Sequence, residues 1–286
     1  MDEQTQDKYL PPNAQANQGA VPASYAPNPV IVTPPPRQYK FDDAISDEEK
    51  RHRVSVIIVN IILAPFFFLL ATSLIVYSCG LFLIAPVVAW LFSEVQVRRI
   101  QALGVTVSPA QFPEVYRATE QVCARFGIPN RFKVVVVQSG EMNAFALKVA
   151  SNRLVILYSS AVESIIDSPD EIAALMGHEI CHHVRDHGWT RFFLLYRPAP
   201  FKAARELTCD NAGLLAAGNA YAMTQVLKKL SVGRDLSRRI NDHALEEEAR
   251  QINSGFTGWL VRRYLSHPPV GARIQNLREF AARAGF

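Results

Sequence analysis

A long apolar run constrains the fold of this chain more than any other feature. Residues 54–95 read VSVIIVNIILAPFFFLLATSLIVYSCGLFLIAPVVAWLFSEV, with no charged side chain before Glu94. One bilayer crossing needs about 20 apolar residues, so this run is too long for a single span. Residues 78–80 (Ser-Cys-Gly) interrupt it near the middle. We therefore predict a transmembrane hairpin of two helices, over about 54–77 and 81–96. The alternative, a buried hairpin of a soluble protein, is disfavoured by the unbroken apolar length.

The basic residues that flank the run predict its orientation. Lys50, Arg51 and Arg53 precede the first helix, Arg98 and Arg99 follow the second, and the turn between the helices carries no cation. Because cations stay on the cytoplasmic side, both ends should face the cytosol. We expect a multi-pass protein of the cell (inner) membrane with the following domain in the cytoplasm. The four cysteines form no C-x-x-C pair, which favours free thiols in a reduced compartment.

The N-terminal segment differs in composition from the rest of the chain. Residues 1–40 are rich in Pro, Gln, Asn and Ala, which favours disorder. We assign residues 1–50 to a disordered tail, 51–99 to the hairpin and 100–286 to a globular domain. The stretch VTPPPRQYK (Val32–Lys40) could bind an SH3-like partner, but we favour a flexible tail because short Pro clusters are common in such segments.

The region after residue 100 predicts an α+β domain that is mostly helical with a small sheet. A helix is expected over about 112–126, and apolar β-branched runs predict strands over 132–139 and 153–159. An edge strand and turn should lie between these strands. The net charge is only +4, without an aromatic-interleaved basic stripe, which argues against nucleic acid as a partner.

A histidine-rich helix is the clearest functional motif. In SPDEIAALMGHEICHHVRDHG, Ser168 and Glu171 form the sequence pattern of a capping box, and Gly188 is a natural end, so we predict a helix over about 169–187. His178 and His182 lie four residues apart and share one face. Together with Glu179 they form H-E-x-x-H, two metal ligands and a general base.

The second histidine pair on this helix is not expected to bind the same ion. His183 and His187 are rotated by about 100° from the first pair. For both we favour a polar helix face.

A third ligand is needed to hold a metal with an open position. Glu206 and Asp210 lie one helical turn apart, and a carboxylate can complete the set while another accepts the spare N–H of a ligand histidine. Spacing alone leaves open whether Glu206 instead pairs with Arg205 or Lys202 on a solvated face.

Four motifs in order resemble the HtpX-like and CAAX-prenyl-protease family of membrane-anchored zinc metallopeptidases, metallopeptidase family forty-eight. They are MNAFAL (Met142–Leu147), HEICH (His178–His182), ELTCDNAGLL (Glu206–Leu215) and HPPVGARIQNL (His267–Leu277). The resemblance implies a zincin-like domain with one Zn²⁺ per chain, held by His178, His182 and Glu206. It further implies Glu179 as the base, Asp210 behind the ligands, and His267 and Arg273 near the site. By the same resemblance, Asn143, Ala144 and Phe145 line the substrate cleft.

The chain also departs from the family. It has Cys181 where the family often has Gly, and FFLLY (Phe192–Tyr196) is too short to cross a bilayer, whereas HtpX carries further membrane helices there. CAAX processing is therefore not expected.

We expect a membrane-anchored zinc endopeptidase acting on a protein or peptide substrate, and the resemblance suggests a role in membrane-protein quality control. The substrate would lie as an extended strand beside residues 142–147, and we assign His267 to the oxyanion as a hypothesis. One alternative is a zinc-stabilised, non-proteolytic membrane scaffold or binding module, and intact Glu179 argues against it. Another is a structural membrane protein with a chance motif.

Overall fold

The computed structural model describes residues 38–149, 152–185, 196–265 and 267–286. Most of the Pro-rich segment, together with His187 and Gly188, lies outside the described residues.

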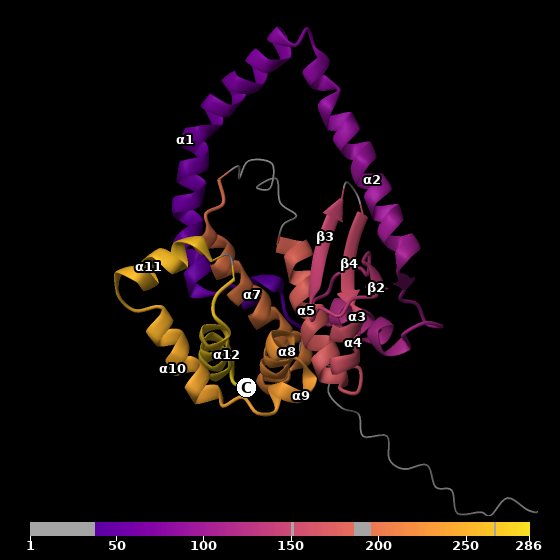
Figure 1. The fold of residues 1–286 in the computed structure, drawn as a ribbon, viewed down its shortest axis with the longest axis vertical. Helices are drawn as coiled ribbons and strands as arrows, with labels where there is room; N and C mark the ends of the chain where they lie inside the picture. The colour runs from indigo at the N-terminus through magenta and orange to yellow at the C-terminus, as the bar shows by residue number, and fades with distance from the viewer. Residues whose placement is uncertain (1–37, 150–151, 186–195, 266) are drawn as a thin grey trace, which may run out of the picture. The chain divides into compact units, whose positions relative to one another are not determined.

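Two long apolar helices form the N-terminal part of the described chain (Figure 1). Helix α1 spans Asp47–Tyr77, and helix α2 (Ala85–Leu103) follows a short 3₁₀ turn, η2 (Leu81–Leu83). Cys79 and Gly80 take positive φ angles of 49° and 83°, which reverse the chain between the helices. Both segments are long and apolar enough to cross a membrane, and most of their apolar side chains are exposed. The two helices predicted from the sequence are confirmed as helices, although both are longer than expected.

The chain folds before the predicted end of the tail. Phe41–Ala44 forms a 3₁₀ turn, η1, in which Phe41 and Ala44 are buried and Phe41 stacks on Phe126 at 4.0 Å between ring centroids. Helix α1 begins at Asp47 rather than at about residue 54, because the Ser46 hydroxyl caps it by accepting a hydrogen bond from the Glu49 amide. The boundary predicted at residue 50 therefore lies inside helix α1.

A four-stranded mixed sheet supports the domain. Its strands are β1 (Val105–Thr106), β2 (Lys133–Val137), β3 (Ala144–Val149) and β4 (Asn152–Tyr158), in the order β1-β2-β4-β3. Strands β2 and β4 are parallel, with Val135 opposite Ile156, and β3 pairs antiparallel with β4. The expected edge strand is thus confirmed as β3, which pairs only with β4 among the described strands.

Helices cover both faces of this sheet. Val135 and Ile156 pack with Val97 of α2 on one face. Val134 and Val155 belong to the main core on the other face, with α3 (Pro113–Arg125) and α5 (Pro169–Arg185). Burial on both faces explains why β2 reads as an unbroken run of valines.

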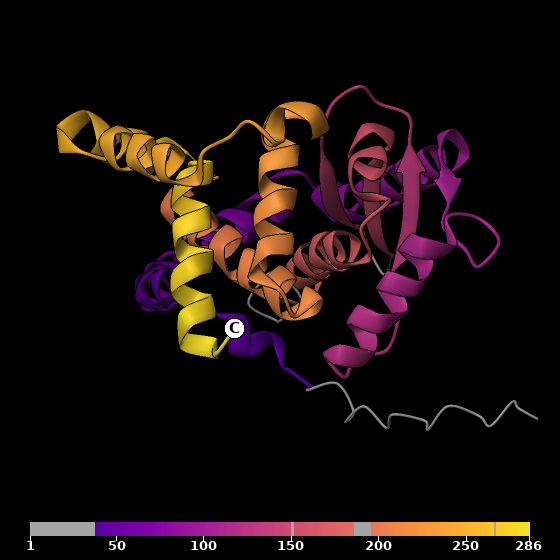
Figure 2. The same cartoon turned by 90° about the horizontal axis from the view of Figure 1, so that it is seen from below.

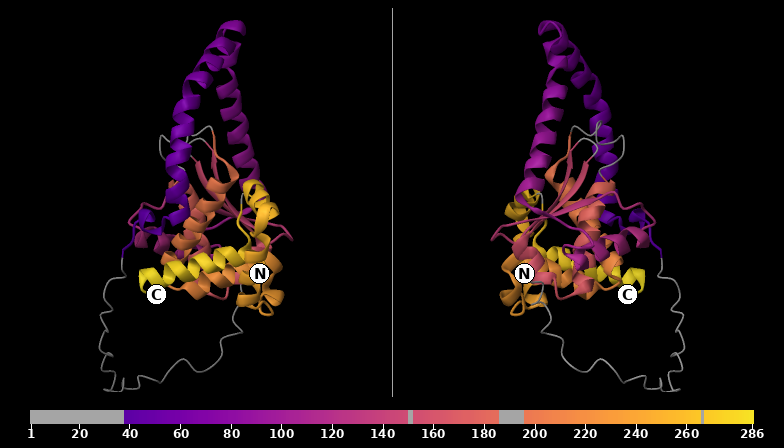
Figure 3. Two further views of the ribbon diagram at one scale, coloured as in Figure 1. Left: turned by 90° about the vertical axis from the view of Figure 1, so that its left-hand side faces the viewer. Right: turned by 90° about the vertical axis from the view of Figure 1, so that its right-hand side faces the viewer.

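The remaining described helices complete the domain, as Figures 2 and 3 show from other sides. They are α4 (Ser159–Ile165), α7 (Ala199–Ala217), α8 (Ala220–Val232), α9 (Arg234–Ser237), α10 (Asp242–Ile252), α11 (Gly255–Tyr264) and α12 (Val270–Ala284). The mostly helical α+β architecture with a small sheet, preceded by two apolar helices, agrees with the sequence prediction.

Two glycines allow α5 and α7 to pack closely. A Cβ at Gly213 would lie 2.6 Å from the Ala174 carbonyl oxygen, and a Cβ at Gly177 would overlap that of Ala216. Any larger side chain at these positions would push the helices apart. The close approach places the polar residues of α7 beside the histidines of α5.

Candidate active site

Helix α5 begins as the sequence predicted. The Ser168 hydroxyl accepts a hydrogen bond from the Glu171 amide at 3.4 Å. The Glu171 carboxylate does not complete the capping box but pairs with Lys229 of α8 at 2.5 Å. The described helix runs to Arg185, so the predicted end near Gly188 lies outside the described residues.

Three side chains from α5 and α7 converge as a potential metal site. The Nε2 atoms of His178 and His182 are 3.1 Å apart. Oxygen atoms of Glu206 lie 3.7 Å from His178 Nε2 and 3.4 Å from His182 Nε2. These ligand atoms all lie within 4.8 Å of one another, a spacing that one ion could bridge. Two imidazoles and one carboxylate form the donor set of an open zinc site. Glu206 therefore does not lie on a solvated face.

A buried ion pair lies behind His178. Oδ1 of Asp210 is 2.9 Å from His178 Nδ1. Arg273 of α12 donates to both oxygens of Asp210, at 2.7 and 2.6 Å. Burial alone would raise the pKa of Asp210, but Arg273 and His178 hold it below its usual value. Asp210 can thus orient the His178 ring as a carboxylate.

His182 has a different partner, which the sequence analysis missed. Sγ of Cys209 lies 3.4 Å from His182 Nδ1. Burial raises the pKa of Cys209 well above its usual value, so it faces the ring as a neutral thiol. The two residues are 27 positions apart in the sequence, so spacing alone could not predict this contact. It forms because α7 packs on α5.

Glu179 is buried beside the potential ligands. Burial raises the pKa of its carboxyl group, an effect that His178 and His182 oppose. Among the described residues, none hydrogen-bonds to its Oε2 atom. Glu179 is one of the residues that line the cleft.

Glu206 is held as a carboxylate. Burial alone would raise its pKa, but His267, the two α5 histidines and Arg273 lower it below the usual range. His267 Nδ1 lies 3.1 Å from Glu206 Oε2, while its side chain is 67% exposed. His267 therefore contacts the potential ligand set from the solvent side.

The cleft contains the segment expected to meet the substrate. Asn143, Ala144 and Phe145 line it together with Glu179 and His267. Four apolar side chains that the sequence analysis did not identify also line it: Leu175, Met223, Leu227 and Leu230.

His183 departs from its predicted role. It is buried rather than on a polar face, with Nε2 lying 3.1 Å from the Leu154 carbonyl oxygen and its ring packed near Phe132. It therefore joins α5 to the sheet. His187, for which the same role was predicted, is outside the described residues.

Comparisons with known proteins show similarity to metallopeptidases. Residues 109–201 match the model of peptidase family M48. The chain is 27% identical over 176 residues to plastoglobule-localized metallopeptidase 48 of Arabidopsis thaliana, covering 51% of this chain and 51% of that protein. It is also 23% identical over 235 residues to the protease HtpX homolog of Salinibacter ruber, covering 68% of this chain and 83% of that protein. The match thus spans about half the length of the Arabidopsis protein. The three matches support the resemblance of this chain to peptidase family M48.

Proposed function

We propose that this protein is a membrane-anchored, zinc-dependent endopeptidase with its catalytic domain in the cytosol. The convergence of His178, His182 and Glu206 next to the buried carboxyl group of Glu179 carries the proposal. The match of residues 109–201 to a metallopeptidase family supports it. The two apolar helices and the likeness to an HtpX homologue support the membrane anchor.

The donor set suits zinc. His178, His182 and Glu206 would hold the ion, Asp210 and Cys209 would orient the two imidazole rings, and the remaining position would stay open to solvent or substrate. Zinc in such a site polarises a carbonyl group and makes a water molecule more acidic.

Glu179 would act as the general base and then as the general acid. Its Oε2 atom, which has no partner among the described residues, would accept a proton from the attacking water. The same carboxyl group would then donate that proton to the leaving amine, which balances the proton in peptide hydrolysis.

The substrate would bind along strand β3. This edge strand offers backbone groups to an extended peptide, and Asn143–Phe145 lie at its cleft end. His267, exposed and near Glu206, would stabilise the oxyanion.

The substitution Glu179→Gln tests this function. It should retain about one zinc per chain yet lower proteolysis by about 10²–10⁴-fold, since it removes a positioned general base. Metal analysis and cleavage of a quenched fluorescent protein substrate by the full chain in detergent measure both. Asp170→Asn is the matched control, because it makes the same chemical change at an exposed position of the same helix. Equal cleavage by Glu179→Gln and wild type would contradict the mechanism, and zinc-bound wild type without proteolysis would favour the scaffold alternative.

A further inference from the structure

Helix α11 exposes an unusual set of apolar side chains. Phe256 and Tyr264 are 75% and 78% exposed, and Trp259, Leu260 and Val261 are also exposed. Only Gly258 of this helix is buried, where it approaches the backbone of residues 252–253. Contiguous apolar side chains exposed on the surface of a domain mark a site of interaction. The exposed side of α11 therefore indicates a binding partner.

The position of α11 identifies that partner. Arg263 and Tyr264 line a hollow together with Ser55, Val56 and Val59 of α1. This part of α1 is where the charged residues at 50–53 give way to the apolar run. If α1 spans the bilayer, as proposed above, the C-terminal end of α11 lies at the level where α1 enters it.

A polar contact on α1 marks the same level. Asn60 donates to the Tyr196 carbonyl oxygen at 2.9 Å and accepts from the Tyr196 amide at 2.8 Å. Backbone N–H and C=O groups without hydrogen-bond partners are not tolerated in hydrocarbon. The backbone of Tyr196 could therefore lie near the hydrocarbon only because Asn60 pairs with both of its polar groups. If α1 spans the bilayer, the surface of the bilayer would lie close to this turn of α1.

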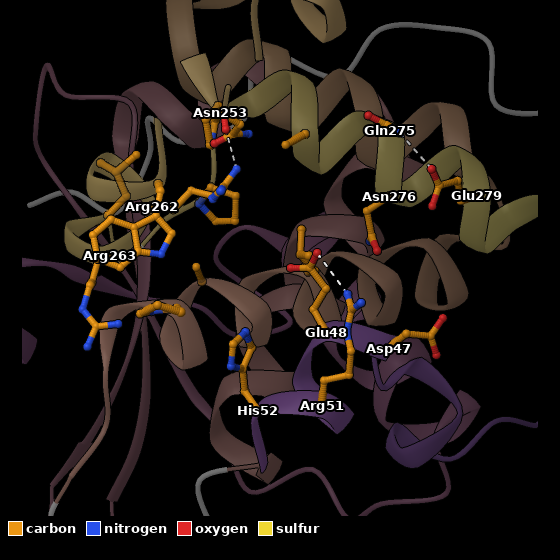
Figure 4. A pocket seen from close by; sticks show the side chains of 18 of the residues that line it. Asp47, Glu48, Arg51, His52, Asn253, Arg262, Arg263, Gln275, Asn276 and Glu279 are labelled. Carbon is orange, nitrogen blue, oxygen red and sulfur yellow. Dashed lines mark hydrogen bonds and ion pairs between the residues drawn. The ribbon is translucent and has the colours of Figure 1, made fainter. Parts of the chain in front are cut away.

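Cationic groups accompany the apolar ones. Arg262 and Arg51 project from opposite walls of a larger pocket between α11 and α1, with His52 nearby (Figure 4). Arg262 donates to the Asn253 carbonyl, and the Arg263 guanidinium lies 5.6 Å from the centre of the Trp259 ring. Neither contact neutralises the positive charge.

The acids of the same pocket are already engaged by other groups. Glu48 pairs with Arg51, Asp47 pairs with Lys50 and Arg283, and Glu279 accepts from Gln275. Arg262 and Arg263 thus remain as the cations of α11 that can meet an external anion.

We propose that α11 is an interfacial helix that docks the domain on the bilayer. Its ten residues are too few to cross a membrane. Phe256, Trp259 and Tyr264 would lie at the boundary between headgroups and acyl chains, and Arg262 and Arg263 would bind phosphates of anionic lipids. This inference rests on the proposed span of α1.

Quenching of tryptophan fluorescence by brominated acyl chains tests the docking. The full chain is reconstituted in phosphatidylcholine vesicles with or without phosphatidylglycerol. Of its three tryptophans, only Trp259 is kept, with Trp90 and Trp189 changed to Phe. We expect Trp259 to be quenched, and more strongly in the anionic vesicles. Arg262→Gln with Arg263→Gln should lower the ratio of docked to undocked α11 in those vesicles by up to about 25-fold, since each cation contributes roughly a factor of five.

Two further variants make the result decisive. A chain that keeps only Trp90, in α2, tests the membrane span itself. A Trp-free chain with Tyr221→Trp places an indole on α8, at a residue that is 68% exposed, where no quenching is expected. Quenching of Trp90 without quenching of Trp259 would overturn the docking proposal while leaving the span intact. Shielding of Trp259 that rises with the protein-to-lipid ratio would also overturn it, because a second copy would then cover α11. Absence of quenching at Trp90 would refute the span, and with it this inference, but not the peptidase site.

Discussion

A buried ion pair joins the base of helix α1 to both helices of the candidate metal site. Glu49 accepts from Arg185 at 2.6 Å and from the Thr208 hydroxyl at 2.6 Å, and both charged side chains are almost fully buried. Arg185 lies three residues beyond His182, and Thr208 lies between Glu206 and Asp210. The substitution Glu49→Ala therefore removes one contact to each of these two helices.

The expected cost follows from burial. Removing one partner of a buried pair costs about 3–5 kcal/mol, because the other charge is left uncompensated. Asp42, 2.9 Å from Arg185, continues to pair with it, so we expect the low end, about 3 kcal/mol. In a domain of this size 1 kcal/mol corresponds to roughly 2–4 °C, which gives a fall in Tm of about 6–12 °C.

Thermal unfolding of the full chain in detergent measures this fall, and zinc titration reports on the site. The neighbouring Glu48 provides a matched control, since it pairs with Arg51 at 3.5 Å and both side chains are exposed. An exposed pair contributes about 0–1 kcal/mol, so Glu48→Ala should change Tm by only a few degrees. Equal melting temperatures for the two variants would refute the argument that burial sets the cost.

Three further predictions concern the site and the anchor. Glu206→Ala should leave little zinc bound, whereas Asp210→Asn should still bind zinc, with affinity or activity lower by about 10–100-fold. Zinc titration of both variants tests this, and loss of zinc from Asp210→Asn with retention by Glu206→Ala would reverse the assignment. Gly213→Ala should lower the denaturation midpoint, because the added methyl group overpacks the contact between α5 and α7. Overpacking costs about 1–3 kcal/mol, which exceeds the gain in helix propensity of about 1 kcal/mol. A higher midpoint would contradict the close packing of the two helices. A reporter fused after Phe286 should behave as cytoplasmic, and an external location would contradict the proposed orientation.

The parts of the fold that local patterns determine could be predicted from the sequence. The apolar run, the valine-rich strand and the Ser168 cap each depend on neighbouring residues, and the corresponding helices and strand are present. The two apolar helices nevertheless extend about seven residues beyond their expected bounds, α1 at its start and α2 at its end. The segment at 41–49 was missed because its burial depends on distant partners. Its sequence is mostly polar, but Phe41 packs on Phe126, and Ser46 bonds to Thr208.

In the candidate site, too, features set by neighbouring residues could be predicted, whereas features set by the packing of distant elements could not. The spacing of His178 and His182 on one helix gives their shared face directly. The position of Glu206 was left open by spacing, because it depends on how α7 packs on α5. Cys209 could be assigned to His182 only from that packing, and the burial of His183 depends on the strand that contacts it.

The charges of the buried site suit a divalent cation. Glu179, Glu206 and Asp210 are three buried carboxyl groups, and Arg273 is the cation that contacts two of them. If all three are ionised, two negative charges remain uncompensated, which is costly in a buried environment. Protons on His178 and His182 can balance this charge, because neighbouring acidic groups raise the pKa of both rings although burial lowers it. One divalent ion on His178, His182 and Glu206 would take the place of these protons, since histidine binds a metal ion in its neutral form.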